Sequence, residues 1–132
     1  MTNDGKVAPL GNYPALKIFG DLIFVSGISA RLPDNSIAGV EHVGGQIKGD
    51  AAIQTRVILD KLEALLKKHG SGLDQCLDVT AFLTDMDDFP TFNRVYAEYF
   101  QIETGPARTT VAVKALPKAG MVVELKVVAA RP

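Results

Sequence analysis

Apolar and polar residues alternate with a period of two in several short stretches, which predicts β-strands. The stretch "LKIFGDLIFVSG" holds two apolar runs on either side of Gly20-Asp21, a pair suited to a tight turn. We expect a β-hairpin with strands at Leu16–Phe19 and Leu22–Ser26. "CLDVTAFLTD", "ARTTVAV" and "MVVELKVVAA" alternate in the same way and predict three further strands. In the first of these the expected apolar side consists of Leu77, Val79, Ala81 and Leu83.

Helical spacing replaces this alternation in two longer stretches. In "GDAAIQTRVILDKLEALLKKHGSG" we expect Asp50 to cap the start of a helix and Gly70 to end it. His69 lies on the apolar stripe and is interpreted as a packed or capping histidine. The second helix is expected in "DDFPTFNRVYAEYFQIETG", with Asp88 as its cap and Pro90 in its first turn. Its aromatic side is formed by Phe89, Phe92, Tyr96 and Phe100.

The segment between the hairpin and the first helix, from Ile28 to Gly49, contains four glycines and "PDNS" and is expected to be mostly loop. One short strand is possible in it, near Glu41–Val43. Residues 1–132 then form a single α+β domain, in which two helices cover one face of a mostly antiparallel sheet. The other face is too apolar to lie wholly in water, so we expect a homo-oligomer.

The composition narrows the classes of function. Hydrophobic residues make up 47% of the chain, which is typical of a folded domain. The 14 Lys+Arg and 15 Asp+Glu are nearly balanced, which argues against a nucleic-acid partner. The polar start "MTNDGKVAPLG" and the lack of a run of about 20 apolar residues predict neither a signal peptide nor a membrane span, so a cytoplasmic location is expected. Two histidines and the single Cys76 show no ligand spacing, so no metal site is expected, and no dinucleotide or phosphate-loop motif calls for a cofactor.

Two charged residues in the predicted strands are candidates for chemistry. Arg108 follows a Gly-Pro corner in "GPARTTVAV" and can bind a carboxylate through two parallel hydrogen bonds. Glu124 lies among apolar residues in "MVVELKVV", where partial desolvation would raise its pKa towards that of a useful general base. Alternatively, Arg108 is a solvated strand end and Glu124 forms an ion pair with a nearby lysine or with Arg108. If the last two strands form a hairpin, Glu124 lies opposite residue 111 or 112, and Arg108 is about four residues, or ~13 Å, further along.

Several collinear motifs resemble the RidA (YjgF) family of enamine/imine deaminases over nearly the whole chain. "NYPALKIFGDLIFVSG" resembles the opening hairpin of the family, with Tyr13 and the Ser26-Gly27 pair at family spacing. "FLTDMDDFPTFNRVYAEYF" resembles its strand and second helix, with Asn93 and Tyr96 in place, and "GPARTTVAVKALPKAGMVVELKVVA" resembles its C-terminal signature.

The resemblance implies a chorismate-mutase-like α+β fold and a homotrimer with sites between its subunits. It also implies hydrolysis of reactive imines to 2-oxo acids and ammonia without a cofactor. In this reading Arg108 binds the substrate carboxylate and Glu124 orients or activates a water, while Tyr13, Ser26, Gly27 and Asn93 line the cleft. The family often has a cysteine where this chain has Thr110. Thr110 can hydrogen-bond but supplies no thiolate, and imine hydrolysis needs none.

A finer resemblance concerns "SGISARLPDNSIAGVE", which is similar to a segment of the 2-aminomuconate deaminase branch. The substrate of that branch is a longer dicarboxylate enamine, for which Arg31 would be a second cation. Alternatively, "LPDNS" is an ordinary turn and Arg31 is exposed. Two other functions stay open: a generalist deaminase of 2-iminobutanoate and 2-iminopropanoate, and a non-catalytic trimer that binds carboxylate metabolites or proteins.

Overall fold

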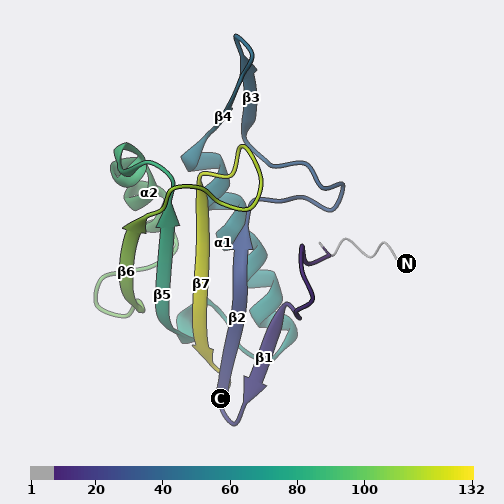
Figure 1. Cartoon of the computed structure of the whole chain (residues 1–132). Coiled ribbons are helices and arrows are strands. Elements are labelled where there is room, and N and C mark those ends of the chain that lie inside the picture. The colour runs from purple at the N-terminus through teal and green to yellow at the C-terminus, as the bar shows by residue number, and fades with distance from the viewer. Residues whose placement is uncertain (1–7) are drawn as a thin grey trace.

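The computed structural model describes residues 8–132, and residues 1–7 of the polar N-terminal stretch lie outside it. A five-stranded sheet carries helix α1 (Ala51–Lys68) and helix α2 (Phe89–Tyr96) on one face, as Figure 1 shows. The sheet order is β1-β2-β7-β5-β6, and β5 and β6 are the one parallel pair in it. The α+β fold predicted from the sequence is therefore confirmed. The strands of this sheet are β1 (Leu16–Phe19), β2 (Leu22–Ser29), β5 (Cys76–Leu83), β6 (Ala107–Ala112) and β7 (Val123–Ala130).

The core lies between this sheet and α1. Alternate residues of the three central strands point towards the helix and are fully buried, as the period of two predicts. Each such side chain stabilises the fold by about 1.5–3 kcal/mol relative to an exposed one. The core side chains of β2, β5 and β7 are Ile23, Val25, Val79, Ala81, Leu83, Val123, Leu125 and Val127, and those of α1 are Ile58, Leu59, Leu62 and Leu66.

Helix α1 begins and ends where its sequence predicts. The Asp50 carboxylate accepts a hydrogen bond from the backbone N–H of Ile53 at 2.9 Å, which satisfies one of the free donors of the first turn. Gly70 adopts a φ of 73°, in the left-handed region that glycine enters without strain. His69 is the C-terminal cap residue and its Nδ1 lies 3.0 Å from the Leu65 carbonyl oxygen, in agreement with its interpretation as a capping histidine.

Helix α2 is shorter than expected and is not capped by Asp88. The Asp88 side chain makes no capping hydrogen bond, because a 3-10 turn, η2 (Met86–Asp88), precedes the helix. Asp85 caps that turn by accepting from the N–H of Asp87 at 2.8 Å. The helix ends at Tyr96, after which the N–H of Glu98 donates to the carbonyl three residues earlier, as in a 3-10 turn.

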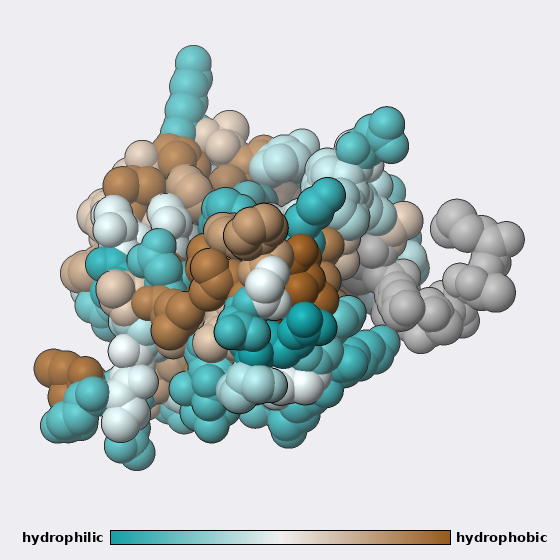
Figure 2. All heavy atoms as spheres, turned by 90° about the horizontal axis from the view of Figure 1, so that it is seen from below, coloured by the Kyte–Doolittle hydropathy of each residue, from teal (hydrophilic) through white to brown (hydrophobic). Residues whose placement is uncertain are grey.

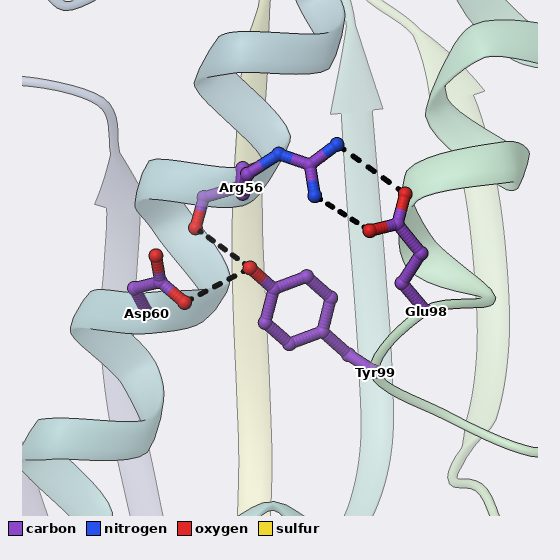
Figure 3. Close-up of polar contacts among 4 residues, drawn as sticks. All are labelled: Arg56, Asp60, Glu98 and Tyr99. Atoms are coloured by element: carbon purple, nitrogen blue, oxygen red, sulfur yellow. Dashed lines mark hydrogen bonds and ion pairs between the residues drawn. The ribbon is translucent and has the colours of Figure 1, made fainter.

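A polar cluster joins the two helical segments on their outer surface (Figure 3). Arg56 of α1 binds the Glu98 carboxylate through two hydrogen bonds, at 2.6 and 3.3 Å. The Tyr99 hydroxyl donates to the Asp60 carboxylate at 2.9 Å. Burial, together with this hydrogen bond, raises the pKa of Tyr99 to about 12, so the donor proton stays in place at neutral pH. The cluster joins the turn that follows α2 to the outer surface of α1.

Two strands differ from the prediction because of β-bulges. Strand β2 continues to Ser29, three residues beyond its predicted end, and its pairing with β7 shifts between Val25 and Ile28. Strand β5 shifts its pairing between Cys76 and Asp78. An inserted residue reverses the side-chain alternation beyond it. The prediction that Leu77 shares the buried side of β5 is therefore wrong: Leu77 is exposed, whereas Cys76 is buried.

The segment between β2 and α1 contains a second hairpin, and one of its strands is the short strand predicted near Glu41–Val43. Strands β3 (Val40–Val43) and β4 (Gln46–Gly49) pair with each other and form a separate two-stranded sheet. The hairpin projects beyond the end of the main sheet, at the top of Figure 1. Its turn, Gly44-Gly45, has positive φ at both residues, the geometry that tight hairpin turns favour.

No helix covers the second face of the sheet within residues 8–132. Phe24 of β2 and Val111 of β6 point to this face, and each is 38% exposed. Seen from the end where β1 turns into β2, apolar side chains also reach the surface among polar ones (Figure 2). This agrees with the reasoning that led us to expect oligomers, and the oligomer itself stays a prediction. In the described part of the chain, no helix combines the length and the apolar character that a membrane span requires.

Candidate functional site

Arg108 lies at the start of the edge strand β6 and points to the helix-covered face of the sheet. Its strand partner is Val79, which in turn pairs with Val127, and both valines are fully buried beneath the helices. The guanidinium donates from Nη2 to the Asn93 side-chain oxygen of α2 at 2.7 Å. Among residues 8–132 no carboxylate forms an ion pair with Arg108. Arg108 is thus held in place by Asn93 without an ion partner among these residues, rather than being a freely solvated strand end.

Three aromatic rings of α2 surround the same guanidinium. The Arg108 Cζ atom lies 4.7 Å from the ring centre of Tyr96, 5.2 Å from that of Phe92 and 5.8 Å from that of Phe89. We call Arg108, Asn93 and these three residues the arginine half-site. The sequence marks the aromatic side of this helix but not its contact with Arg108. In the sequence, the spacing of three and four residues between Phe89, Phe92 and Tyr96 indicates that their rings lie on one face of the helix.

Glu124 lies at the start of β7 and points to the uncovered face of the sheet. It pairs with Phe82 on one side and with Ser29 on the other. Burial raises the pKa of its carboxyl group above the usual value, as the sequence predicts. No ion pair of Glu124 is present in the described residues, and the nearby Lys126 donates instead to the carbonyl of Val25 at 3.3 Å.

The Glu124 carboxylate lies against the bulge of β2. A Cβ atom built on Gly27 would lie 2.6 Å from Oε2 of Glu124, so any other residue here requires the carboxylate to move from this position. The neighbouring Ser26 donates from its hydroxyl to the carbonyl of Pro14 at 2.7 Å, which ties β2 to the segment before β1. Tyr13, in that segment, is 48% exposed. We call Glu124, Gly27, Ser26 and Tyr13 the glutamate half-site.

The two half-sites do not meet within one chain. The last two strands do not form the hairpin considered above, because β5 lies between β6 and β7. Glu124 pairs with Phe82 and Phe82 with Val111, so two strand spacings and three residues put the Cα atoms of Glu124 and Arg108 about 14 Å apart. Their side chains also lie on opposite faces, since Val79 and Phe82 are an odd number of residues apart. One small ligand cannot touch both groups of the same chain.

Comparison with known proteins agrees with this architecture. The model of the family Ribonuc_L-PSP, described as Endoribonuclease L-PSP, matches residues 4–131. The chain belongs to this family. The resemblance to RidA (YjgF) proteins that the motifs carry is thereby confirmed.

Relatives in the Ribonuc_L-PSP family extend over the whole domain. A RutC family protein of Pyrococcus horikoshii is 36% identical over 121 residues, which cover 92% of this chain and 88% of that protein. The crystal structure of RidA from an Antarctic Psychrobacter has a TM-score of 0.81 and 26% identity, and covers 98% of this chain and 96% of that one. The crystal structure named YEO7_yeast has a TM-score of 0.83 and 32% identity, with 97% and 94% covered.

Arg31, the candidate second cation, is buried rather than exposed. Only 8% of it is accessible, and its guanidinium donates to the Asn35 side-chain oxygen at 2.9 Å and to the carbonyl of Ala8. The turn expected in "LPDNS" is present, with Asn35 at a φ of 75°. Lys61 of α1 donates to the carbonyls of Ser29 and Arg31, and burial, reinforced by the charge of Arg31, lowers its pKa to about 8.

Thr110 follows Arg108 on the same face of β6, opposite Ala81. Its Oγ1 is buried and has no hydrogen-bond partner among the described residues. No group of three or more His, Cys, Asp or Glu residues suited to a metal ion is present in residues 8–132.

Gly27→Ala is expected to lower the kcat/KM of any reaction that uses Glu124 about a hundredfold without unfolding the protein, because the new methyl group would lie 2.6 Å from Oε2 and must displace the carboxylate. The backbone tolerates alanine here, since Gly27 is not among the glycines with positive φ. Gly72→Ala is the matched control. Its Cβ would meet an Asp74 oxygen at 2.8 Å, outside both half-sites. Steady-state kinetics and thermal melts of both variants check this; equal activity losses would contradict it.

Proposed function

We propose that this protein is a cofactor-independent deaminase that hydrolyses enamine or imine carboxylates to 2-oxo acids and ammonia. The observation that carries the proposal is the pair formed by a fixed cation and a partly desolvated carboxylate, each without an ion partner in the described part of the chain. A protein that only binds carboxylates would need Arg108 but has no use for Glu124. This favours the enzyme over a non-catalytic binding protein.

The half-sites are proposed to meet between subunits of a homotrimer. Arg108 with Asn93 would come from one subunit, and Glu124 with Gly27, Ser26 and Tyr13 from its neighbour. The separation of about 14 Å on opposite faces of the sheet supports this, since a substrate with a few carbon atoms spans less. The exposed apolar residues of the uncovered face supply a surface for such contacts.

The proposed reaction starts with the substrate carboxylate held by Arg108. A water molecule adds to the carbon of the C=N bond, and one of its protons passes to Glu124. The proton then moves to the nitrogen and gives a carbinolamine. Glu124 next carries the hydroxyl proton to the same nitrogen, so that the carbonyl forms while the C–N bond breaks with its electron pair on nitrogen and ammonia leaves. A raised pKa makes Glu124 a stronger base once it is ionised. The products are a 2-oxo acid and ammonia.

For the finer substrate we propose a dicarboxylate of the 2-aminomuconate type. Arg31 and Lys61 lie close together, and their described partners are neutral oxygens. Two neighbouring cations without a carboxylate favour an anion nearby. The burial of Arg31 favours the second candidate, a generalist that acts on 2-iminobutanoate and 2-iminopropanoate, since a distal carboxylate would have to replace Asn35 or Ala8 as the partner of Arg31.

Parallel assays of ammonia release test both levels of the proposal. The wild type is expected to release ammonia from 2-aminomuconate and from 2-iminobutanoate faster than buffer does. Arg31→Ala should raise KM for 2-aminomuconate about tenfold and leave 2-iminobutanoate unaffected, because only the dicarboxylate has a second acid group to lose. Equal losses on both substrates would remove the dicarboxylate preference. Release no faster than in buffer from either compound would remove the enzyme.

A further inference from the structure

The environment of the Arg108 guanidinium holds it without neutralising it. Phe89, Phe92 and Tyr96 lie three and four residues apart along α2 and present their rings on one side of the helix. All three ring centres lie within 5.8 Å of Cζ, inside the distance of about 6 Å at which a ring face attracts a cation. We call these three residues the aromatic seat.

The aromatic seat also removes water from one side of the guanidinium. Phe92 is fully buried, and its ring centre lies 5.5 Å from that of Tyr96. The described polar partner of the Arg108 guanidinium is the neutral side-chain oxygen of Asn93. A cation–π contact is stronger when the cation is desolvated, so the seat favours one position of the charged group.

We propose that Phe89, Phe92 and Tyr96 are positioning residues, which orient the guanidinium of Arg108 for the substrate carboxylate while preserving its full positive charge. A carboxylate at this place would fix the arginine equally well but would compete with the substrate, whereas rings and an amide oxygen do not. The proposal rests on the proposed function for its kinetic consequence. The geometry of the seat can be tested without it.

The kinetic test replaces rings by leucine. Phe89→Leu and Tyr96→Leu are expected to raise KM about tenfold with a smaller change in kcat, because the binding of the carboxylate is common to ground state and transition state. Tyr96→Phe should restore KM, since it keeps the ring. Tyr99→Leu is the matched control: it alters an aromatic residue of the same segment that contacts Asp60 and not Arg108, and it should leave KM unchanged.

The second readout is the NMR signal of the Arg108 Nε–Hε group, identified by its loss in Arg108→Lys. Ring currents should move the chemical shift of this proton away from that of the Hε proton of the exposed Arg94. Tyr96→Leu should reduce this difference in chemical shift, whereas Tyr99→Leu should not. A wild-type signal at the Arg94 position would overturn the seat, even if a leucine variant fails to fold. If the wild type proves inactive, the proposed function fails. The aromatic seat can still be tested by the NMR shifts and by a titration with pyruvate, which serves as the carboxylate probe. Unchanged KM or pyruvate affinity in both leucine variants would also overturn it.

Discussion

Arg108→Ala is expected to lower kcat/KM for the proposed imine substrate about a thousandfold and to leave the fold intact. The substitution removes the charged group that we propose binds the substrate carboxylate, and the loss of one partner of such a pair costs about 2–5 kcal/mol, with each 1.4 kcal/mol giving a factor of ten. The fold should survive because Arg108 lies on the edge strand and bonds to a single described side chain, Asn93. Ammonia release at several substrate concentrations measures the loss, and a thermal melt checks the fold.

Two further variants distinguish the role of Arg108 from a general effect of charge. Arg108→Lys keeps the positive charge but cannot form two parallel hydrogen bonds in one plane, so it should recover only a small part of the activity. Arg94→Ala removes an exposed arginine from the same helix that carries Asn93, and it should have no effect. Activity of Arg108→Ala within tenfold of the wild type would show that the carboxylate binds elsewhere.

The sequence predicts those elements whose pattern reflects burial. Strand β1 and the limits of α1 follow from alternation and from the Asp50 and Gly70 signals, and the structure has them where expected. The hairpin of β3 and β4 does not touch the core, and its residues from 41 to 48 are all exposed. The short strand predicted near Glu41–Val43 is present as β3, but no apolar alternation marks β4 as its partner.

The residues of the candidate site are visible in the sequence, but their arrangement is not. Arg108 and Glu124 stand out because each is a charge in an apolar strand. Their separation depends on the position of β5 between β6 and β7. This strand order is determined by the packing of the whole sheet and not by any local sequence pattern. Local pattern favours the hairpin of neighbouring strands, since consecutive strands usually pair. In this protein the last two strands, β6 and β7, do not pair, and Arg108 is therefore separated from Glu124.

Glu124→Gln is expected to lower kcat about 10²–10⁴-fold, the usual contribution of a general base, because an amide cannot take the proton of the attacking water. Burial raises the pKa of Glu124, so the wild-type rate should fall as the pH falls through that raised value. The residual rate of Glu124→Gln should lack this acid limb. Rate measurements from acid to neutral pH compare the two profiles, and identical profiles would contradict the role of Glu124 as a base.

The same substitution should stabilise the protein at neutral pH. The pKa of Glu124 is higher in the folded protein than in the unfolded chain, so the folded state binds this proton more tightly. Its contribution to stability is therefore present at acid pH and is lost as the pH rises through the folded pKa. Glutamine carries no charge to desolvate and should raise Tm at pH 7 relative to the wild type, with the difference vanishing in acid. A variant that loses activity and gains stability cannot owe its loss to unfolding.

The inactive variants together decide whether the two half-sites belong to different subunits. When Arg108→Ala and Glu124→Gln chains are unfolded, mixed in equal amounts and refolded, about a quarter of the sites should combine an intact Arg108 from one chain with an intact Glu124 from another. Activity should then return to about a quarter of the wild-type value, far above that of either variant alone. If each site lay within one chain, mixing would restore nothing. The separation of the two residues on opposite faces of the sheet leads us to expect the recovery.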